Sequence, residues 1–195
     1  PTASGMGGLI FGFGQAGGIA DVEAAKPETL LLLGADDVDP ARFAGSFKVY
    51  IGHHGDSGAR MADLVLPGAA YPEKHGTYVN TEGRVQRGER AAFAPGEARE
   101  DWTIFRAVSD LLGAPLPFDR FDQLRARMIE EHPQLGQEGL IAFDWSPPRL
   151  DAKPEGAVVY PIRDFYLTNP IARSSPTMRQ CSDELVQGRI QEAAE

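Results

Sequence analysis

Three short apolar segments, each followed by glycine or proline, constrain the fold of this chain more than any other feature of its sequence. They cover residues 29–33, 47–51 and 62–66. The first reads Thr-Leu-Leu-Leu-Leu, and a continuous apolar run of this length is typical of a strand buried on both faces of a parallel sheet. The connections between the segments are long enough for short helices. We therefore predict an α/β fold with short parallel strands and flanking helices.

Downstream patterns predict a hairpin and three helices. The segments 77–80 and 84–87 are β-prone and flank a glycine, which favours two paired strands. The clearest helical pattern covers 98–112, where the large apolar residues recur on one face. A second helix is expected over 121–131 and an amphipathic one over 177–193.

The chain divides into three parts on these patterns. Residues 1–28 form a glycine-rich segment, with seven glycines among the first 20 residues, which we expect to be loop rather than helix or strand. Residues 29–132 form a partial α/β domain. Residues 133–195 form an extended, proline-rich tail with a C-terminal helix. The glycine-rich start gives the impression of a piece cut from a longer chain.

Composition excludes several classes of protein. The chain has 195 residues, with 19 Lys and Arg against 28 Asp and Glu, a formal charge of −9, so we expect no nucleic-acid partner. Cys181 is the single cysteine, which excludes an internal disulfide, a four-cysteine zinc site and an iron–sulfur cluster within this sequence and favours a reducing compartment. No segment approaches the roughly 20 apolar residues of a spanning helix, so we expect no direct membrane insertion.

One glycine pattern suggests nucleotide binding. Gly12, Gly14 and Gly17 match G-x-G-x-x-G, and Asp36 follows where a ribose-binding acid would stand. The preceding strand would be only about three residues long, however, and the following segment has no apolar face. In a chain with 22 glycines such a match arises easily, and a loop is the preferred interpretation.

A second group suggests metal ligands, namely His53, His54 and Asp56, with Asp63 and His75 nearby. Adjacent histidines on a strand point to opposite sides, and the spacing fits no established zinc pattern. Glycines on both sides of the group favour a turn.

The remaining reactive side chains carry weaker signals. Ser57 lies outside a nucleophile elbow and Cys181 has no histidine nearby in sequence, so both are interpreted as structural. Glu73, Lys74 and Glu82 have the chemistry for acid–base work, but solvated ion pairs explain them equally well.

Motifs in a fixed order carry a family resemblance over residues 29–190. They are Leu-Leu-Leu-Gly-Ala-Asp (31–36), Gly-His-His-Gly-Asp (52–56), Ala-Asp-Leu-Val-Leu-Pro-Gly-Ala-Ala-Tyr (62–71) and Gly-Thr-Tyr-Val-Asn-Thr-Glu-Gly-Arg-Val-Gln (76–86). This pattern resembles the molybdopterin-oxidoreductase superfamily. With Ala-Arg-Glu-Asp-Trp (98–102), Asp-Phe-Tyr-Leu-Thr-Asn (164–169) and Arg-Ser-Ser-Pro-Thr-Met-Arg-Gln-Cys (173–181), it is similar to the large iron–sulfur subunits of respiratory complex I, NADH:quinone oxidoreductase.

The resemblance implies a structural role for this segment. Intact subunits of that family carry 2Fe–2S and 4Fe–4S clusters on cysteines of their N-terminal part, and the complex carries FMN. None of those cysteine motifs occurs here, so we expect no catalytic, cofactor-binding or metal-binding residue in this chain. The implied partners are other subunits of the peripheral arm, on the cytoplasmic side of a bacterial inner membrane or the matrix side of a mitochondrial one.

The residues themselves suggest why the motif exists without a cofactor. Asn80 and Glu82 flank Gly83, where the backbone must reverse, Arg84 can pair with an acid, and Asp63 can accept backbone N–H bonds in the next turn. We interpret the motif as a polar network that locks turns. Two other functions stay open: a fragment of a molybdenum- or tungsten-pterin oxidoreductase resembling formate dehydrogenase, and a stand-alone interaction domain.

Overall fold

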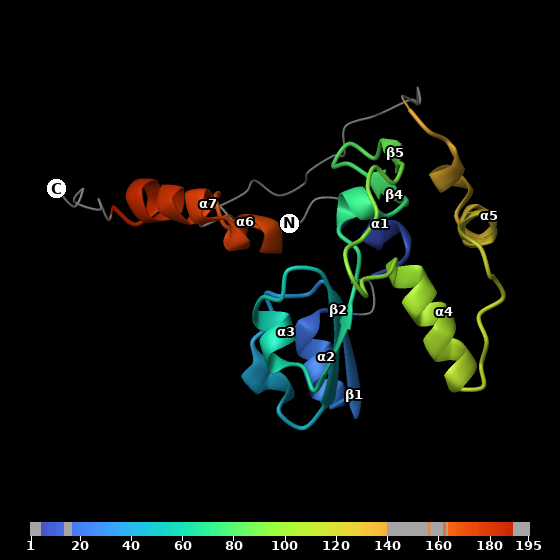
Figure 1. The fold of residues 1–195 in the computed structure, drawn as a ribbon, viewed down its shortest axis with the longest axis horizontal. Coiled ribbons are helices and arrows are strands. Elements are labelled where there is room, and N and C mark those ends of the chain that lie inside the picture. Colours follow the sequence, from blue (N-terminus) through green and yellow to red (C-terminus); the bar gives the residue numbers. More distant parts are fainter. Residues whose placement is uncertain (1–4, 14–16, 140–155, 157–161, 163, 189–195) are drawn as a thin grey trace.

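A computed structural model describes residues 5–13, 17–139, 156, 162 and 164–188 (Figure 1). Its centre is a sheet of three parallel strands in the order β1 (Thr29–Leu33), β2 (Phe47–Gly52) and β3 (Leu64–Pro67). The predicted parallel α/β sheet is confirmed. β3 begins two residues later than expected, because Asp63 uses both its backbone and its carboxylate to bind the backbone of Lys48 ahead of the strand pairing.

Short helices join these strands. η1 (Pro40–Phe43) follows β1 and is capped by Asp39, whose Oδ1 accepts a hydrogen bond from the Ala41 amide at 3.0 Å. α3 (Ser57–Met61) joins β2 to β3. Both connections are short because the strands that they join lie next to each other in the sheet.

The glycine-rich N-terminal segment is helical where we predicted loop. It contains α1 (Gly5–Ile10) and α2 (Ile19–Ala25). α1 forms despite its three glycines because Met6 and Ile10 pack against a buried cluster elsewhere in the chain. The gain from burying these side chains offsets the low helix propensity of glycine.

The predicted hairpin is present, with β4 (Gly76–Val79) paired antiparallel to β5 (Val85–Gly88). Val79 and Val85 lie opposite each other and are 1% and 3% exposed. They form a second hydrophobic cluster together with Leu135, which lies in η3 (Pro133–Gly136). The packing of the domain therefore extends past residue 132.

Two longer helices follow the hairpin. α5 (Phe121–Glu131) has the predicted bounds, whereas α4 (Asp101–Leu111) begins three residues later than predicted. The backbone of Glu100 is extended, with ψ at 133°, and only after it does the chain turn helical. Ahead of Glu100, Arg99 is bound to β3, because its amide donates to Pro67 O.

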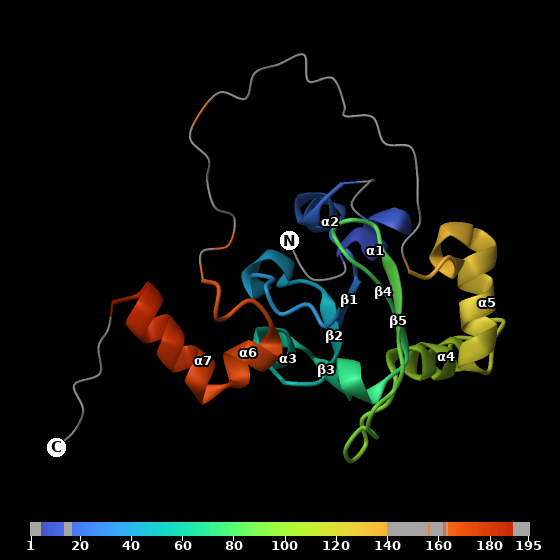
Figure 2. The same cartoon turned by 90° about the horizontal axis from the view of Figure 1, so that it is seen from above.

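The C-terminal part forms α6 (Pro170–Ser174), α7 (Pro176–Cys181) and one π-helical turn, η4 (Ser182–Val186). The single helix predicted over 177–193 is therefore divided into an α-helix and a π-helical turn. Residues 189–193 lie outside the described ones. Seen from above in Figure 2, α6 and α7 continue away from the sheet. Most of the proline-rich tail, residues 140–155 and 157–161, also lies outside the described residues.

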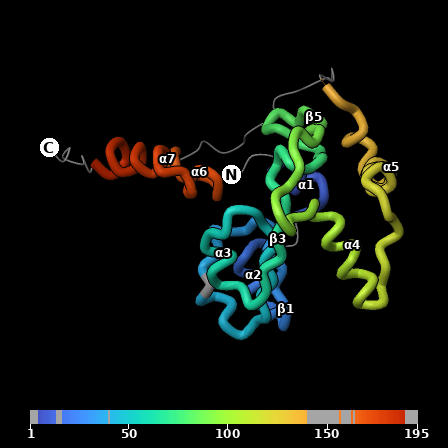
Figure 3. Tube along the Cα trace, in the orientation of Figure 1, coloured from blue at the N-terminus to red at the C-terminus, as the bar shows by residue number. Residues whose placement is uncertain are grey.

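The chain trace shows two bodies, one around the parallel sheet and one around the hairpin, α1 and α5 (Figure 3). The chain between β3 and β4 leads from the first body to the second. The sheet body buries seven apolar residues: Leu32, Phe43, Val49, Tyr50, Ile51, Ala69 and Ala70. In the described parts of the chain, no helix has the length and hydrophobicity needed to cross a bilayer.

Candidate functional site

The carboxyl ends of the three parallel strands define the first place to look for a site. The register places Leu33, Ile51 and Leu66 side by side, so the loops that follow them emerge at one edge of the sheet. In open α/β sheets, ligands bind in the crevice outside this edge. Asp36, His53 and Asp56, which were considered as nucleotide or metal ligands, lie in or just beyond these loops.

Asp36 is the polar centre of this edge and is only 5% exposed. Its carboxylate accepts hydrogen bonds from the Tyr50 hydroxyl and from the Gly58 amide, both at 3.1 Å. The Ser57 hydroxyl donates to the backbone carbonyl of Asp36. Asp36, which was considered as a ribose-binding acid, therefore ties the end of β1 to β2 and to the first turn of α3.

Tyr50 completes this network from the central strand and is 1% exposed. Burial, together with the neighbouring Asp36 carboxylate, raises the pKa of Tyr50 to about 12. A Cβ on Gly58 would lie 2.7 Å from the Tyr50 ring, so only glycine lets α3 approach the strand this closely. The tyrosine is thus a neutral hydrogen-bond donor at physiological pH.

The two histidines after β2 face solvent. His53 and His54 are exposed, and their Nδ1 atoms lie 2.5 Å apart. Partial desolvation lowers the pKa of His53, and the proximity of His54 and Lys74 lowers it further. Both effects favour the neutral ring.

The structure separates the other residues that were considered as metal ligands. Asp56 forms ion pairs with arginines, Asp63 binds Lys48 at the opposite end of the sheet, and His75 lies 2.8 Å from Glu89. Among residues 5–13, 17–139 and 164–188, no three His, Cys, Asp or Glu side chains gather in a way that could hold a metal ion. The turn interpretation agrees with this placement.

The glycine pattern does not form a dinucleotide-binding turn. Leu9 and Ile10, which the nucleotide motif would require in a strand, belong to α1, and Gly12 follows that helix with φ at +80°. Gly17 precedes α2, where the Gly18 amide donates to Asp21 Oδ2 at 2.6 Å. Gly14 lies outside the described residues. A strand before the glycines is a requirement of the nucleotide motif, and a helix takes its place here.

The candidate acid–base residues are engaged in structural contacts. Glu73 Oε2 accepts a hydrogen bond from the Ala70 amide at 2.9 Å, which caps η2 (Tyr71–Glu73). Lys74 forms an ion pair with Asp101 at the start of α4. Cys181 is half-buried at the end of α7. These contacts favour the structural interpretation of each group.

Asn80 organises the hairpin turn as predicted. Its Oδ1 accepts hydrogen bonds from the amides of Glu82 at 3.0 Å and Arg84 at 2.9 Å. Gly83 adopts φ of +86° and donates its amide to Asn80 O. Arg84 takes part through its backbone, and among the described residues its guanidinium has no ion pair. The prediction for Asp63 was wrong in its partner, which is β2 rather than the Pro67-Gly68 turn.

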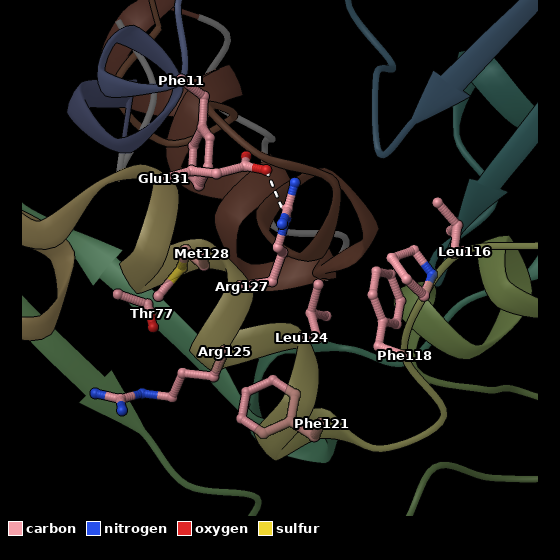
Figure 4. Close-up of a pocket in the computed structure, with 11 residues that line it drawn as sticks. Phe11, Thr77, Leu116, Phe118, Phe121, Leu124, Arg125, Arg127, Met128 and Glu131 are labelled. Atoms are coloured by element: carbon pink, nitrogen blue, oxygen red, sulfur yellow. Dashed lines mark ion pairs between the residues drawn. The ribbon is translucent and has the colours of Figure 1, made fainter.

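An apolar groove of about 560 Å³ lies between α5 and the loop that precedes it (Figure 4). Its lining is mostly apolar, and the one carboxylate in it, Glu131, forms an ion pair with Arg127 on the same helix at 2.7 Å. The lining residues are Phe11, Thr77, Leu116, Pro117, Phe118, Phe121, Leu124, Arg125, Arg127, Met128 and Glu131. Such a surface suits apolar side chains better than chemistry on a polar substrate.

Comparison with known proteins gives matches to two families. Residues 2–111 match the molybdopterin oxidoreductase family, which is more than half of the chain. This chain belongs to the molybdopterin oxidoreductase family. Residues 145–181 also match a second family, the C-terminal domain of the NADH-ubiquinone oxidoreductase G subunit.

The relatives of this molybdopterin oxidoreductase family member carry the names of complex I subunits. It is 46% identical, over 93% of its length, to the mitochondrial 78 kDa subunit of NADH-ubiquinone oxidoreductase from Neurospora crassa, and 40% identical over 93% to the 75 kDa subunit from Reclinomonas americana. The mitochondrial 78 kDa subunit from Candida albicans is 43% identical over 82% of the chain. The chain spans 24–27% of the length of these relatives.

The residues at the sheet edge do not fit the phosphate-bearing pterin for which the family is named. An anionic group is disfavoured at this edge by the Asp37 and Asp56 carboxylates, and the third acid there, Asp36, is buried. The Asp36 carboxylate already accepts hydrogen bonds from Tyr50 and Gly58, and the other two form ion pairs with Arg173 from α6. The described residues offer this edge no unpaired cation that could bind phosphate.

Sequence reasoning missed the two residues that dominate this edge. Tyr50 stands in an apolar strand, where a buried tyrosine hydroxyl normally needs a partner, and this signal could have directed attention to Asp36. Arg173 lies 117 residues after Asp56 in the sequence. No pattern of spacing connects them.

Proposed function

We propose that this chain is a cofactor-free, structural portion of the large iron–sulfur subunit of proton-pumping NADH:quinone oxidoreductase. The single observation that carries the proposal is similarity along nearly the whole chain, at 40–46% identity, to relatives named as 75 and 78 kDa subunits of that enzyme. The match of residues 145–181 to the C-terminal domain of the G subunit supports the same assignment.

The role proposed for this portion is packing. On one face of the parallel sheet, Leu31 and Leu33 of β1 and Phe47 at the start of β2 are 51–55% exposed, whereas Val49 and Ile51 of β2 are buried there. Parallel sheets are normally covered on both faces, so this face is suited to contact with the remaining part of the subunit. In the assembly, which transfers electrons from NADH through FMN and iron–sulfur clusters to quinone, other subunits of the peripheral arm would be the further partners.

The test is performed on the full-length protein, tagged and purified from membranes under mild detergent. The proposal predicts that the protein migrates in a large complex that oxidises NADH. It also predicts that the protein lies on the cytoplasmic or matrix side of the membrane and that its own chain does not insert into the bilayer. Migration alone, or in a complex without NADH oxidation, would contradict the proposal.

Metal analysis of the same preparation distinguishes the second candidate, a molybdenum- or tungsten-pterin oxidoreductase, which the family match over residues 2–111 favours. Iron and FMN without stoichiometric molybdenum, tungsten or pterin is the result expected for complex I. Stoichiometric molybdenum or tungsten with pterin would support the alternative.

A further inference from the structure

The carboxyl edge of the sheet is contacted by a segment from the far end of the chain. Residues 164–188 contain α6, α7 and η4, and α6 supplies Arg173. The guanidinium Nε donates to the carboxylate of Asp56, and Nη1 lies 3.2 Å from Asp37 Oδ1. Asp37 follows β1 and Asp56 follows β2, so a single side chain joins two neighbouring strand-end loops.

The contact with Asp56 is well shielded. The side chains of Arg173 and Asp56 are 21% and 18% exposed, whereas that of Asp37 is 75% exposed. The hydrogen bond from Arg173 is the largest cause that holds the pKa of Asp56 below its ordinary value. Shielding from water and a charge-assisted hydrogen bond both place this pair above an ordinary surface ion pair.

Hydrogen bonds within the segment 164–188 hold together the part of the chain that carries Arg173. Ser182 is fully buried, and its hydroxyl donates to Asp164 Oδ2 at 2.5 Å. Arg179 donates to Arg173 O at 2.8 Å, and Arg173 Nη1 also donates to Leu167 O at 3.2 Å. A segment held together in this way moves as a unit, so anchoring one of its side chains positions the whole.

Among the described residues, the ion pairs and hydrogen bonds that join 164–188 to 17–139 all involve Arg173. We propose that Arg173 is a clasp that holds α6, and through it the C-terminal segment, against the carboxyl edge of the parallel sheet, where α/β sheets take ligands. The carboxylates of Asp37 and Asp56 supply the negative charge that pairs with the Arg173 guanidinium. The clasp rests on these contacts and stands independently of the enzyme assignment.

The experiment is hydrogen–deuterium exchange, followed by mass spectrometry, on the full-length protein and its variants. Arg173→Gln is expected to accelerate amide exchange in peptides from 164–188 and in the loop at 55–58 by about tenfold, the factor that corresponds to roughly 1.4 kcal/mol. Asp56→Asn is expected to accelerate exchange in the same distant segment. Raising the salt concentration is expected to act in the same direction, less strongly, because the pair is partly shielded.

A matched control and a rescue separate the clasp from local effects. Arg127→Gln removes an arginine that forms ion pairs only within α5, and it is expected to leave exchange in 164–188 unchanged. The charge exchange Arg173→Asp with Asp56→Arg is expected to restore part of the protection that either single change loses. If Asp56→Asn leaves the segment unchanged while Arg173→Gln loosens it, Arg173 serves only its own turn through Leu167 O, and the clasp is wrong.

Discussion

The two faces of the outer strand β1 have nearly the same sequence character and opposite surroundings, whereas Val49 and Ile51 of the neighbouring β2 are buried on the side that β1 exposes. On one face Leu32 and Tyr50, neighbours in the register, are 4% and 1% exposed, and α3 lies close to Tyr50. On the other, Leu31 and Leu33 of the same strand are 55% and 52% exposed, and Phe47 is 51% exposed. Residues 29–33 are apolar on both sides, so the difference lies in what the chain places over each face.

This comparison shows that the residue pattern of a strand can indicate contacts that its own chain does not make. A strand with one face in water normally alternates polar and apolar residues, whereas one covered twice does not. β1 has the pattern of a strand that is covered on both faces, but the described residues cover only one of its faces. The uncovered face therefore supports the proposal that further protein packs here, as the relatives of about fourfold greater length would provide.

The largest expected effect on stability comes from Tyr50→Ala, which tests the covered face. Removing a buried aromatic ring from the covered face, together with the hydroxyl that binds Asp36, is expected to destabilise this chain by about 3–5 kcal/mol. Chemical denaturation followed by circular dichroism measures this change. A loss below about 1 kcal/mol would mean that the covered face is not the core of the sheet.

The hairpin turn lies outside both faces and is stabilised by polar contacts instead. Asn80→Leu removes the acceptor for two backbone amides and is expected to destabilise the chain by about 1–3 kcal/mol. Asn80→Asp retains an acceptor oxygen and serves as the control, with a smaller loss expected. Equal denaturation midpoints for the wild type and the leucine variant would refute the role of the turn.

A subtler test asks whether the covered face owes its stability to the ring or to the hydroxyl of Tyr50. Tyr50→Phe keeps the ring and is expected to destabilise the chain by about 1 kcal/mol at neutral pH. The folded-state pKa of Tyr50, about 12, lies above the ordinary value of 10, so its contribution is complete below pH 10 and is lost as pH rises toward 12. Stability curves between pH 9 and 12 are expected to fall more steeply for the wild type than for the phenylalanine variant.

The smallest effect is expected on the uncovered face. Phe47→Ala is expected to change the stability of this chain by less than about 1 kcal/mol, because the ring is already half exposed. In the full-length subunit the same change is expected to destabilise assembly more strongly, which co-purification with the other subunits measures. Equal effects in the two settings would contradict the proposal that this face is a packing surface.

Local patterns were sufficient for much of the fold. The apolar runs located β1 and β2, a single-face pattern gave α5 its bounds, and the glycine between two β-prone pieces placed the hairpin. Each of these signals lies within about a dozen neighbouring residues. α1 was missed because its stability comes from contact with Val79 and Val85 rather than from its own glycine-rich sequence.

The candidate site was predictable only in part. Asn80 was recognised because a turn is a local structure, and its hydrogen bonds reach only to Glu82 and Arg84. The roles of Asp36 and Asp56 were not, since they depend on partners that lie 14 to 117 residues away in the chain. A carboxylate has the same sequence signature whether it binds a ligand, a buried hydroxyl or an arginine.

By itself, the sequence determined the parallel α/β layer, the family and the absence of cluster-binding cysteine motifs, because apolar periodicity, ordered motifs and residue counts are properties of the linear chain. Only the tertiary structure decided which face of β1 is covered, which donors saturate Asp36, and that Arg173 reaches Asp37 and Asp56. These depend on the free energy of burying and pairing groups far apart in the chain, and that free energy exists only once the chain has folded.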